Sequence, residues 1–199
     1  MQDGGDYQSP LWYHAVQFKT KLIYNSALNN QGKIIIYSDV DIQFFGRVTS
    51  LVLDAIKAKD VVFQSEKWPP TGEVNTGFIA IRCNEASLLF WKEVSEHSVV
   101  GLEHGDQSIV NGLLSKKYTH PNLRTDVFPN RFWAPSQGTQ IPNDIIMHHA
   151  NTTMPIIENG LPIGSIEMKI RQLNQIKNQV NPPLYKKMKS LFKTIIKLK

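Results

Sequence analysis

The chain has 199 residues, 41% of them apolar and 20% charged, a balance typical of a globular protein with room for one domain and its core. Its single cysteine, Cys83, excludes an internal disulfide and a cysteine-rich zinc site. The net charge of +5 is concentrated in the lysine-rich residues 186–199, so it does not indicate nucleic-acid binding. No apolar run approaches the roughly 20 residues of a membrane span, and the chain does not open on a signal-peptide core, so a cytoplasmic location is expected.

The periodicity of apolar residues predicts alternating helices and strands in the first half of the chain. Residues 11–29 carry an apolar stripe at helical spacing, and residues 33–38 are a run of β-branched residues typical of a buried strand. A short helix over residues 49–56 and a strand over 60–64 follow. After a loop rich in Pro and Gly, residues 77–83 have the pattern of a third strand.

The second half is predicted to contain helices, a long irregular insert and one more strand. In chain order these are the helices that begin at Asn84 and near Asp106, the Pro-rich insert 118–143 with an extended piece around Val127, the strand 144–147, the helix from Ser165 and a basic helix after Pro183. The order predicts an α/β fold. We expect residues 1–160 to form the main domain and residues 161–199 a helical extension.

The stretch KIIIYSDVDIQFFG carries the strongest indication of chemistry. Asp39 and Asp41 stand at alternate positions directly after the apolar strand, so their side chains share one face of an extended chain. Open α/β sheets bind ligands at such strand ends, and two carboxylates there fit a hard divalent cation that carries a phosphorylated substrate. A solvated turn is the alternative interpretation, because Asp is common in turns.

Three further motifs are compatible with both a functional and a structural role. Asn75-Thr76-Gly77 is either turn chemistry or a place where a ligand approaches the backbone. Asp106, followed by Gln107, suits the N-terminus of a helix as well as a reaction centre. In the pair His148-His149, strand alternation predicts that one ring faces the site, where imidazole would supply a third metal ligand.

Six motifs follow one another in a fixed order: W-x6-K-x-K, IIIYSDVDIQFF, EVNTGFIAIRCNEASLLFWKEV, GDQSIVN, FPNRFW and MHHAN. This series resembles the nucleotide-diphospho-sugar transferase family, glycosyltransferases of the GT-A type, from about residue 10 to residue 153. The resemblance implies a GT-A-like, Rossmann-like mixed sheet flanked by helices. It also implies that a sugar moves from a nucleoside-diphosphate sugar to the hydroxyl of a glycan, lipid or protein acceptor, in polysaccharide or glycoconjugate biosynthesis.

The resemblance also implies roles for particular residues. Asp39, Asp41 and His149 would hold Mn²⁺ or Mg²⁺, with His149 preferred to His148 because Ala-Asn follows it. The residues implied to bind the donor are Lys21, Asp39, Asn75, Thr76 and Gly77, and those implied to lie beside the anomeric carbon or the acceptor are Asp106 and Gln107.

One departure from the family and two rival functions stay open at this point. The family's opening strand, helix and second strand, which hold the nucleotide base, would precede residue 10, so either this is an N-terminally truncated form or the base is held differently. The rivals are a glycosyltransferase-like binding module without catalysis and a metal-dependent phosphatase with Asp39 as nucleophile. Residues 184–199 place an apolar stripe among lysines, which suits either peripheral contact with the inner face of a membrane or a solvated helix face.

Overall fold

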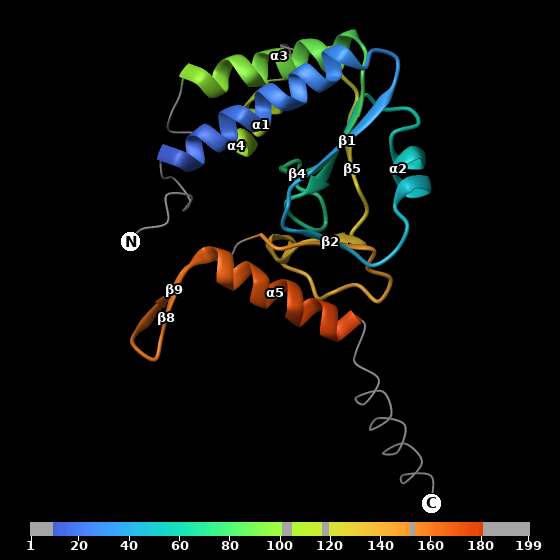
Figure 1. The fold of residues 1–199 in the computed structure, drawn as a ribbon. Helices are drawn as coiled ribbons and strands as arrows, with labels where there is room; N and C mark the ends of the chain where they lie inside the picture. The colour runs from blue at the N-terminus through green and yellow to red at the C-terminus, as the bar shows by residue number, and fades with distance from the viewer. Residues whose placement is uncertain (1–9, 101–104, 117–119, 152–153, 181–199) are drawn as a thin grey trace, which may run out of the picture. The chain divides into compact units, whose positions relative to one another are not determined.

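The computed structural model describes residues 10–100, 105–116, 120–151 and 154–180 (Figure 1). Contacts divide the chain into two units, residues 1–149 and residues 150–199. The elements of the first unit are α1 (Pro10–Asn29), β1 (Ile34–Ser38), β2 (Ile42–Phe44), α2 (Thr49–Ala55), β3 (Val61–Ser65), β4 (Val74–Arg82), α3 (Glu85–Val100), α4 (Asp106–Ser115), β5 (Thr125–Val127), β6 (Phe132–Trp133), a 3-10 turn (Pro135–Gln137) and β7 (Met147–His149).

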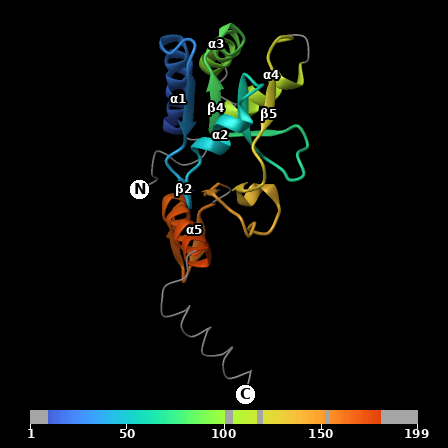
Figure 2. The same cartoon turned by 90° about the vertical axis from the view of Figure 1, so that its right-hand side faces the viewer.

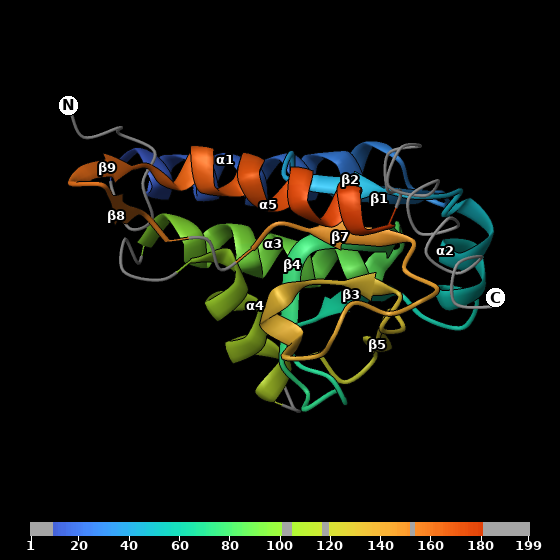
Figure 3. The same ribbon diagram turned by 90° about the horizontal axis from the view of Figure 1, so that it is seen from below.

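The first unit contains two sheets with strands of both directions. The larger sheet has the order β1-β4-β3-β5, in which β4 is antiparallel to β1 and β3 whereas β5 is parallel to β3. The smaller sheet has the order β2-β7-β6, and Figure 3 shows β2 and β7 side by side. The mixed α/β architecture predicted from the sequence is confirmed.

The core lies on both faces of the larger sheet, because every second side chain of its central strands points to the same face. Helices α1 and α3 run side by side along one face, where α4 joins them (Figure 1). Helix α2 covers the other face, nearest the viewer in Figure 2, together with a cluster of aromatic rings. The rings of Phe78, Phe128 and Phe132 lie 4.5–5.6 Å apart in this cluster.

Two strands differ from the predicted ranges because partners distant in sequence decide where strands pair. Strand β4 begins at Val74 instead of residue 77, since Val74 and Asn75 pair with the end of β3 beyond a bulge at Phe63/Gln64. The strand predicted at 144–147 overlaps β7 only at Met147, and β7 continues to His149 because its last residue pairs with Ile42 of β2. The three residues Asn75, Thr76 and His149 are therefore held in sheets instead of loops.

The second unit consists of the hairpin β8 (Ile156–Glu158) and β9 (Leu161–Ile163) followed by α5 (Ser165–Val180). The hairpin turns at Asn159 and Gly160, which both have positive φ. The boundary predicted after residue 160 therefore falls inside this unit. The predicted basic helix lies in residues 181–199, outside the described residues.

Candidate functional site

Asp39 and Asp41 lie in the turn that carries the chain from the larger sheet into the smaller one. Strand β1 ends at Ser38 and β2 begins at Ile42, so both aspartates lie between two strands that belong to different sheets. The backbone N–H of Asp39 donates to the carbonyl of Gly77 at 2.7 Å, which ties the turn to β4. The short turn is therefore fixed at both ends, and its two carboxylates are held close together.

The third member of the site, His149, comes from the far end of the first unit. Its pairing with Ile42 places its ring beside the turn. One ligand atom each of Asp39, Asp41 and His149 lie within 4.8 Å of one another. His149 Nε2 is 3.4 Å from Asp41 Oδ1, and the two side chains are only 6% and 12% exposed. The structure thus brings together the three residues that the sequence predicts as metal ligands.

The back of the His149 ring is enclosed by strands β3 and β4. His149 Nδ1 lies 2.9 Å from the side-chain oxygen of Gln64, a fully buried residue of β3. Gly77 leaves the space for the ring, since a Cβ at this position would lie 2.2 Å from His149 Cε1. Close approach of a ligand to Gly77 is one of two interpretations that the sequence leaves open; the group found against its backbone is this ring, and contact with the donor stays a prediction.

A partly buried ion-pair network connects Asp39 to the start of α4. Lys19 Nζ lies 2.8 Å from Asp106 Oδ2 and 3.2 Å from Asp39 Oδ1. The hydroxyl of Thr76 donates to the same oxygen of Asp106 at 2.7 Å. Burial acts to lower the pKa of Lys19, but the charges of Asp106 and then Asp39 outweigh it, so the pKa is raised. Lys19 is therefore held as a cation between two carboxylates.

Of the two lysines in W-x6-K-x-K, the structure places Lys19 against the carboxylates, whereas the sequence analysis selects Lys21. The buried stripe of α1 runs through Val16, Thr20 and Ile23. Lys19 is adjacent to this stripe and Lys21 is exposed, because two residues correspond to more than half a turn of helix. The helical phase of the apolar residues is the signal that could have identified Lys19.

Tyr37 and Gln64 are further members of the site that the sequence analysis missed. Tyr37 OH donates to Asp39 Oδ1 at 2.6 Å, and Lys19 Nζ lies 5.0 Å from the centre of the Tyr37 ring. Burial, and then the charge of Asp39, raise the pKa of Tyr37, so the phenol stays a hydrogen-bond donor. A Gln inside the buried run VVFQS was the available signal for Gln64, because a buried amide needs partners.

The remaining predicted residues have contacts within the chain. Asn75 donates to Glu66 Oε2 at 2.8 Å and accepts from the Gly77 N–H at 2.8 Å, so its amide braces the start of β4. Gln107 is half-buried in the first turn of α4, and its carbonyl accepts from Asn111. Their predicted contacts with the donor or acceptor stay predictions.

His148 lies apart from the candidate metal ligands. Its ring is fully buried and packs 5.4 Å from that of Trp133, and neither nitrogen has a hydrogen-bond partner in the described structure. Burial, and then the neighbouring His149, lower its pKa to about 4. The neutral ring of His148 is therefore part of the core.

The donor set fits a hard or borderline divalent cation. Two carboxylates and one imidazole are ligands that Mn²⁺ accepts, and Mg²⁺ uses the carboxylates. Because the Gln64 oxygen accepts the hydrogen of His149 Nδ1, the lone pair of a neutral ring is on Nε2, facing Asp41. Two lone-pair atoms at 3.4 Å are compatible when a cation or a proton lies between them.

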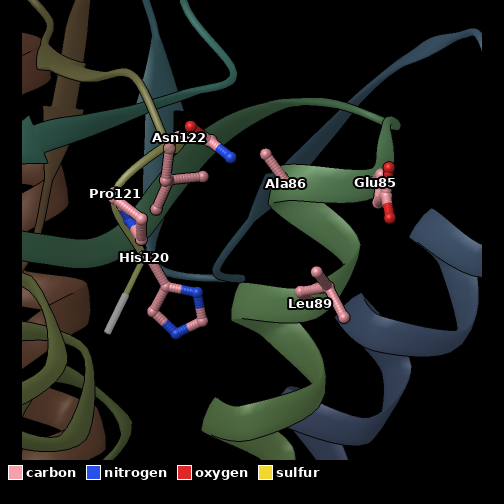
Figure 4. A pocket seen from close by; sticks show the side chains of 7 residues that line it. Glu85, Ala86, Leu89, His120, Pro121 and Asn122 are labelled. Carbon is pink, nitrogen blue, oxygen red and sulfur yellow. The ribbon is translucent and has the colours of Figure 1, made fainter. Parts of the chain in front are cut away.

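A separate surface pocket lies beside the start of α3 (Figure 4). Its lining is Glu85, Ala86, Leu89, His120, Pro121, Asn122 and Leu123. His120 Nε2 is hydrogen-bonded to Glu93 Oε2 at 2.8 Å, and its ring packs edge-on against Phe90. None of these residues belongs to the carboxylate–histidine site, so this pocket does not bear on the metal centre.

Comparison with known proteins gives one match. Residues 4–175 match the family described as nucleotide-diphospho-sugar transferase. No curated protein and no solved structure matches the chain. None of the helices in the described part of the chain is long and apolar enough to cross a bilayer.

Proposed function

Because the chain belongs to the nucleotide-diphospho-sugar transferase family, we propose that it transfers a sugar from a nucleoside-diphosphate sugar to an acceptor hydroxyl, with a divalent cation held by Asp39, Asp41 and His149. The observation that carries this proposal is the convergence of these three ligand atoms within 4.8 Å. The family gives the class of reaction, and the donor set supports dependence on Mn²⁺ or Mg²⁺.

The reaction exchanges one bond at the anomeric carbon. The bond to the diphosphate oxygen breaks, the bond to the acceptor oxygen forms, and the acceptor hydroxyl loses its proton. Positive charge develops on the sugar and negative charge on the departing diphosphate. A divalent cation at this site supplies the countercharge for that diphosphate.

The chain's own residues hold the groups in place. Tyr37 and Lys19 both contact the Asp39 carboxylate, so its orientation is fixed before a ligand arrives. We place the Asp106 carboxylate, with Gln107 beside it, next to the anomeric carbon or the acceptor. Thr76 and Lys19 orient Asp106 from two sides, which suits it to stabilise positive charge on the sugar.

Lys19 takes over the role that the sequence analysis gives to Lys21 at the donor. Its ammonium already lies among the site carboxylates, and it is 14% exposed, so it can face an anionic ligand without moving far. The acceptor is a glycan, lipid or protein hydroxyl. For a lipid-linked acceptor, we propose that residues 184–199 contact an anionic membrane.

A ligand screen tests the proposed function. Nucleoside-diphosphate sugars are added with and without Mn²⁺, and the unfolding temperature is measured, because ligands of the native state raise it. We expect at least one donor to stabilise the protein only with Mn²⁺, and its nucleoside diphosphate to be released when an acceptor is added. Stabilisation without release would identify the binding module instead, and the absence of both would refute the proposal.

A further inference from the structure

A buried hydrogen bond joins the side-chain amide of Gln64 directly to the ring of His149. Its oxygen faces His149 Nδ1 at 2.9 Å, while its amide nitrogen donates to the Phe132 carbonyl at 3.0 Å. A carbonyl only accepts, so the nitrogen of Gln64 must point to Phe132 and its oxygen to the ring. The orientation of this amide is therefore set by the backbone of β6.

A second amide reinforces the same carbonyl. The side-chain nitrogen of Gln137 donates to the carbonyls of Ser65 at 3.1 Å and Phe132 at 3.2 Å. Gln64 is 0% exposed and Gln137 is 2% exposed, so water does not compete for these bonds. Because Gly77 also lies against the His149 ring, the ring has a fixed partner and a fixed position.

We propose that Gln64 is a positioning residue that keeps the hydrogen of His149 on Nδ1 and so directs Nε2 toward Asp41 and the cation. The inference rests on the proposed function for the identity of the ligand, but the hydrogen bond itself does not depend on the cation. Metal-bound histidines generally donate their second ring N–H to a fixed acceptor, and loss of that acceptor weakens metal binding by about 10- to 100-fold. Here the acceptor is an uncharged amide inside the core.

Two substitutions separate the acceptor from the rest of the side chain. Gln64→Glu keeps an oxygen for His149 Nδ1 but loses the bond from the Gln64 nitrogen to the Phe132 carbonyl, which keeps its bond from Gln137. Gln64→Leu has a similar volume and no acceptor. Gln137→Leu is the matched control, because it removes a buried amide bound to the same carbonyl and has no hydrogen bond to His149 in the described structure.

The first measurement reads the ring directly in metal-free protein labelled with ¹⁵N-histidine. We expect a slowly exchanging proton on His149 Nδ1, identified by its loss in His149→Asn. It should persist in Gln64→Glu and Gln137→Leu and disappear in Gln64→Leu. A wild-type ring with no proton on Nδ1 would overturn the inference, and this spectrum needs no variant of Gln64 to fold.

The second measurement is the affinity for Mn²⁺ alone, followed by the electron paramagnetic resonance of the free ion. We expect a dissociation constant within about 3-fold of wild type in Gln64→Glu and Gln137→Leu, and about 10- to 100-fold higher in Gln64→Leu. A folded Gln64→Leu protein with wild-type affinity would overturn the inference. A wild type that binds no Mn²⁺ but keeps the Nδ1 proton would refute the proposed function and still support the positioning role.

Discussion

Two aspartates in the first unit, Asp60 and Asp39, are neutralised in different ways. Asp60, directly before β3, is 1% exposed and accepts four hydrogen bonds. Three come from Arg124, through its backbone N–H, Nε and Nη2 at 2.8–3.0 Å, and one comes from Asn84 at 2.7 Å. The carboxylate therefore has a guanidinium of its own and its bonding capacity is filled.

Asp39, at the end of β1, has no such exclusive partner. It shares the ammonium of Lys19 with Asp106, and Asp41 brings a second carboxylate to within reach of the same metal position. Because Asp39, Asp41 and Asp106 have only one ammonium among them here, the site favours a cationic ligand, whereas the Asp60–Arg124 pair has no capacity left for one. The difference fits a structural role for Asp60 and the proposed ligand-binding role of the Asp39 group.

Among the substitutions considered, Asp41→Asn is expected to have the largest effect on Mn²⁺ binding and sugar transfer. It keeps the shape of the side chain and removes its charge, so we expect Mn²⁺ affinity and sugar transfer to fall by at least about 100-fold, more than loss of an outer partner costs. The matched control is Asp126→Asn, an aspartate that is half exposed and paired with Lys59. An Asp41→Asn protein with wild-type turnover of a confirmed donor would contradict the metal assignment.

Lys19→Met tests the shared ammonium. It leaves Asp39 and Asp106 without their common cation, so we expect the free energy of unfolding to fall by about 2 to 3 kcal/mol in metal-free protein. Added Mn²⁺ should recover part of this loss, because the ion binds the native state. Lys21→Met is the control, expected within about 0.5 kcal/mol of wild type because Lys21 is exposed. Urea unfolding compares the two, and equal effects would reject the central role of Lys19.

Gly77→Ala tests the position of the His149 ring by crowding it. A methyl group at 2.2 Å from Cε1 must displace a ring that cannot bend, so we expect Mn²⁺ affinity to fall by about 10-fold and unfolding to become easier by about 1 to 3 kcal/mol. Gly112→Ala is the matched control, because it lies inside α4 with nothing near its Cβ position and should stabilise the helix by up to about 1 kcal/mol. Unchanged metal affinity in Gly77→Ala would show that the ring is free to move.

The sequence reveals the parts of this site that depend on local pattern. Asp39 and Asp41 follow an apolar run at alternate positions, so both the strand and the pair of carboxylates are readable from adjacent residues. His149 is different, because its place beside Asp41 depends on the pairing of β2 with β7, which are about 100 residues apart. The pair His148-His149 stands out in the sequence at a strand end, but the preference for His149 comes only from the resemblance to a family.

Strand direction and register explain the remaining differences. The bulge between Phe63 and Gln64 decides that Gln64 lies opposite Asn75, and no local signal reports where a bulge occurs. The antiparallel pairing of β1 with β4 is likewise a property of the assembled sheet. By contrast, the position of Lys19 beside the carboxylates depends only on the phase of one helix, so it was readable from the sequence.

The smallest expected effect is the dependence of protein stability on acidic pH that Asp60 causes. Hydrogen bonds from Arg124 lower the pKa of Asp60 to about 2, below its ordinary 3.8. The resulting stabilisation is complete above the pKa of the unfolded chain and is lost as the pH falls through the lower folded value. Because Arg124 is 61% exposed, solvent screening leaves about 1 to 2 kcal/mol.

Asp60→Asn removes this titrating group, so the stability difference between wild type and variant should shrink by that amount from about pH 5 to about pH 2 in urea unfolding. Mn²⁺ affinity near neutral pH should equal that of wild type, since Asp60 has no contact with the candidate ligands among the described residues. A stability difference that stays constant with pH would mean that the Arg124 pair adds nothing specific to the charged form. A change in Mn²⁺ affinity would show that Asp60 influences the candidate metal site, and would contradict the distinction between a structural and a ligand-binding aspartate.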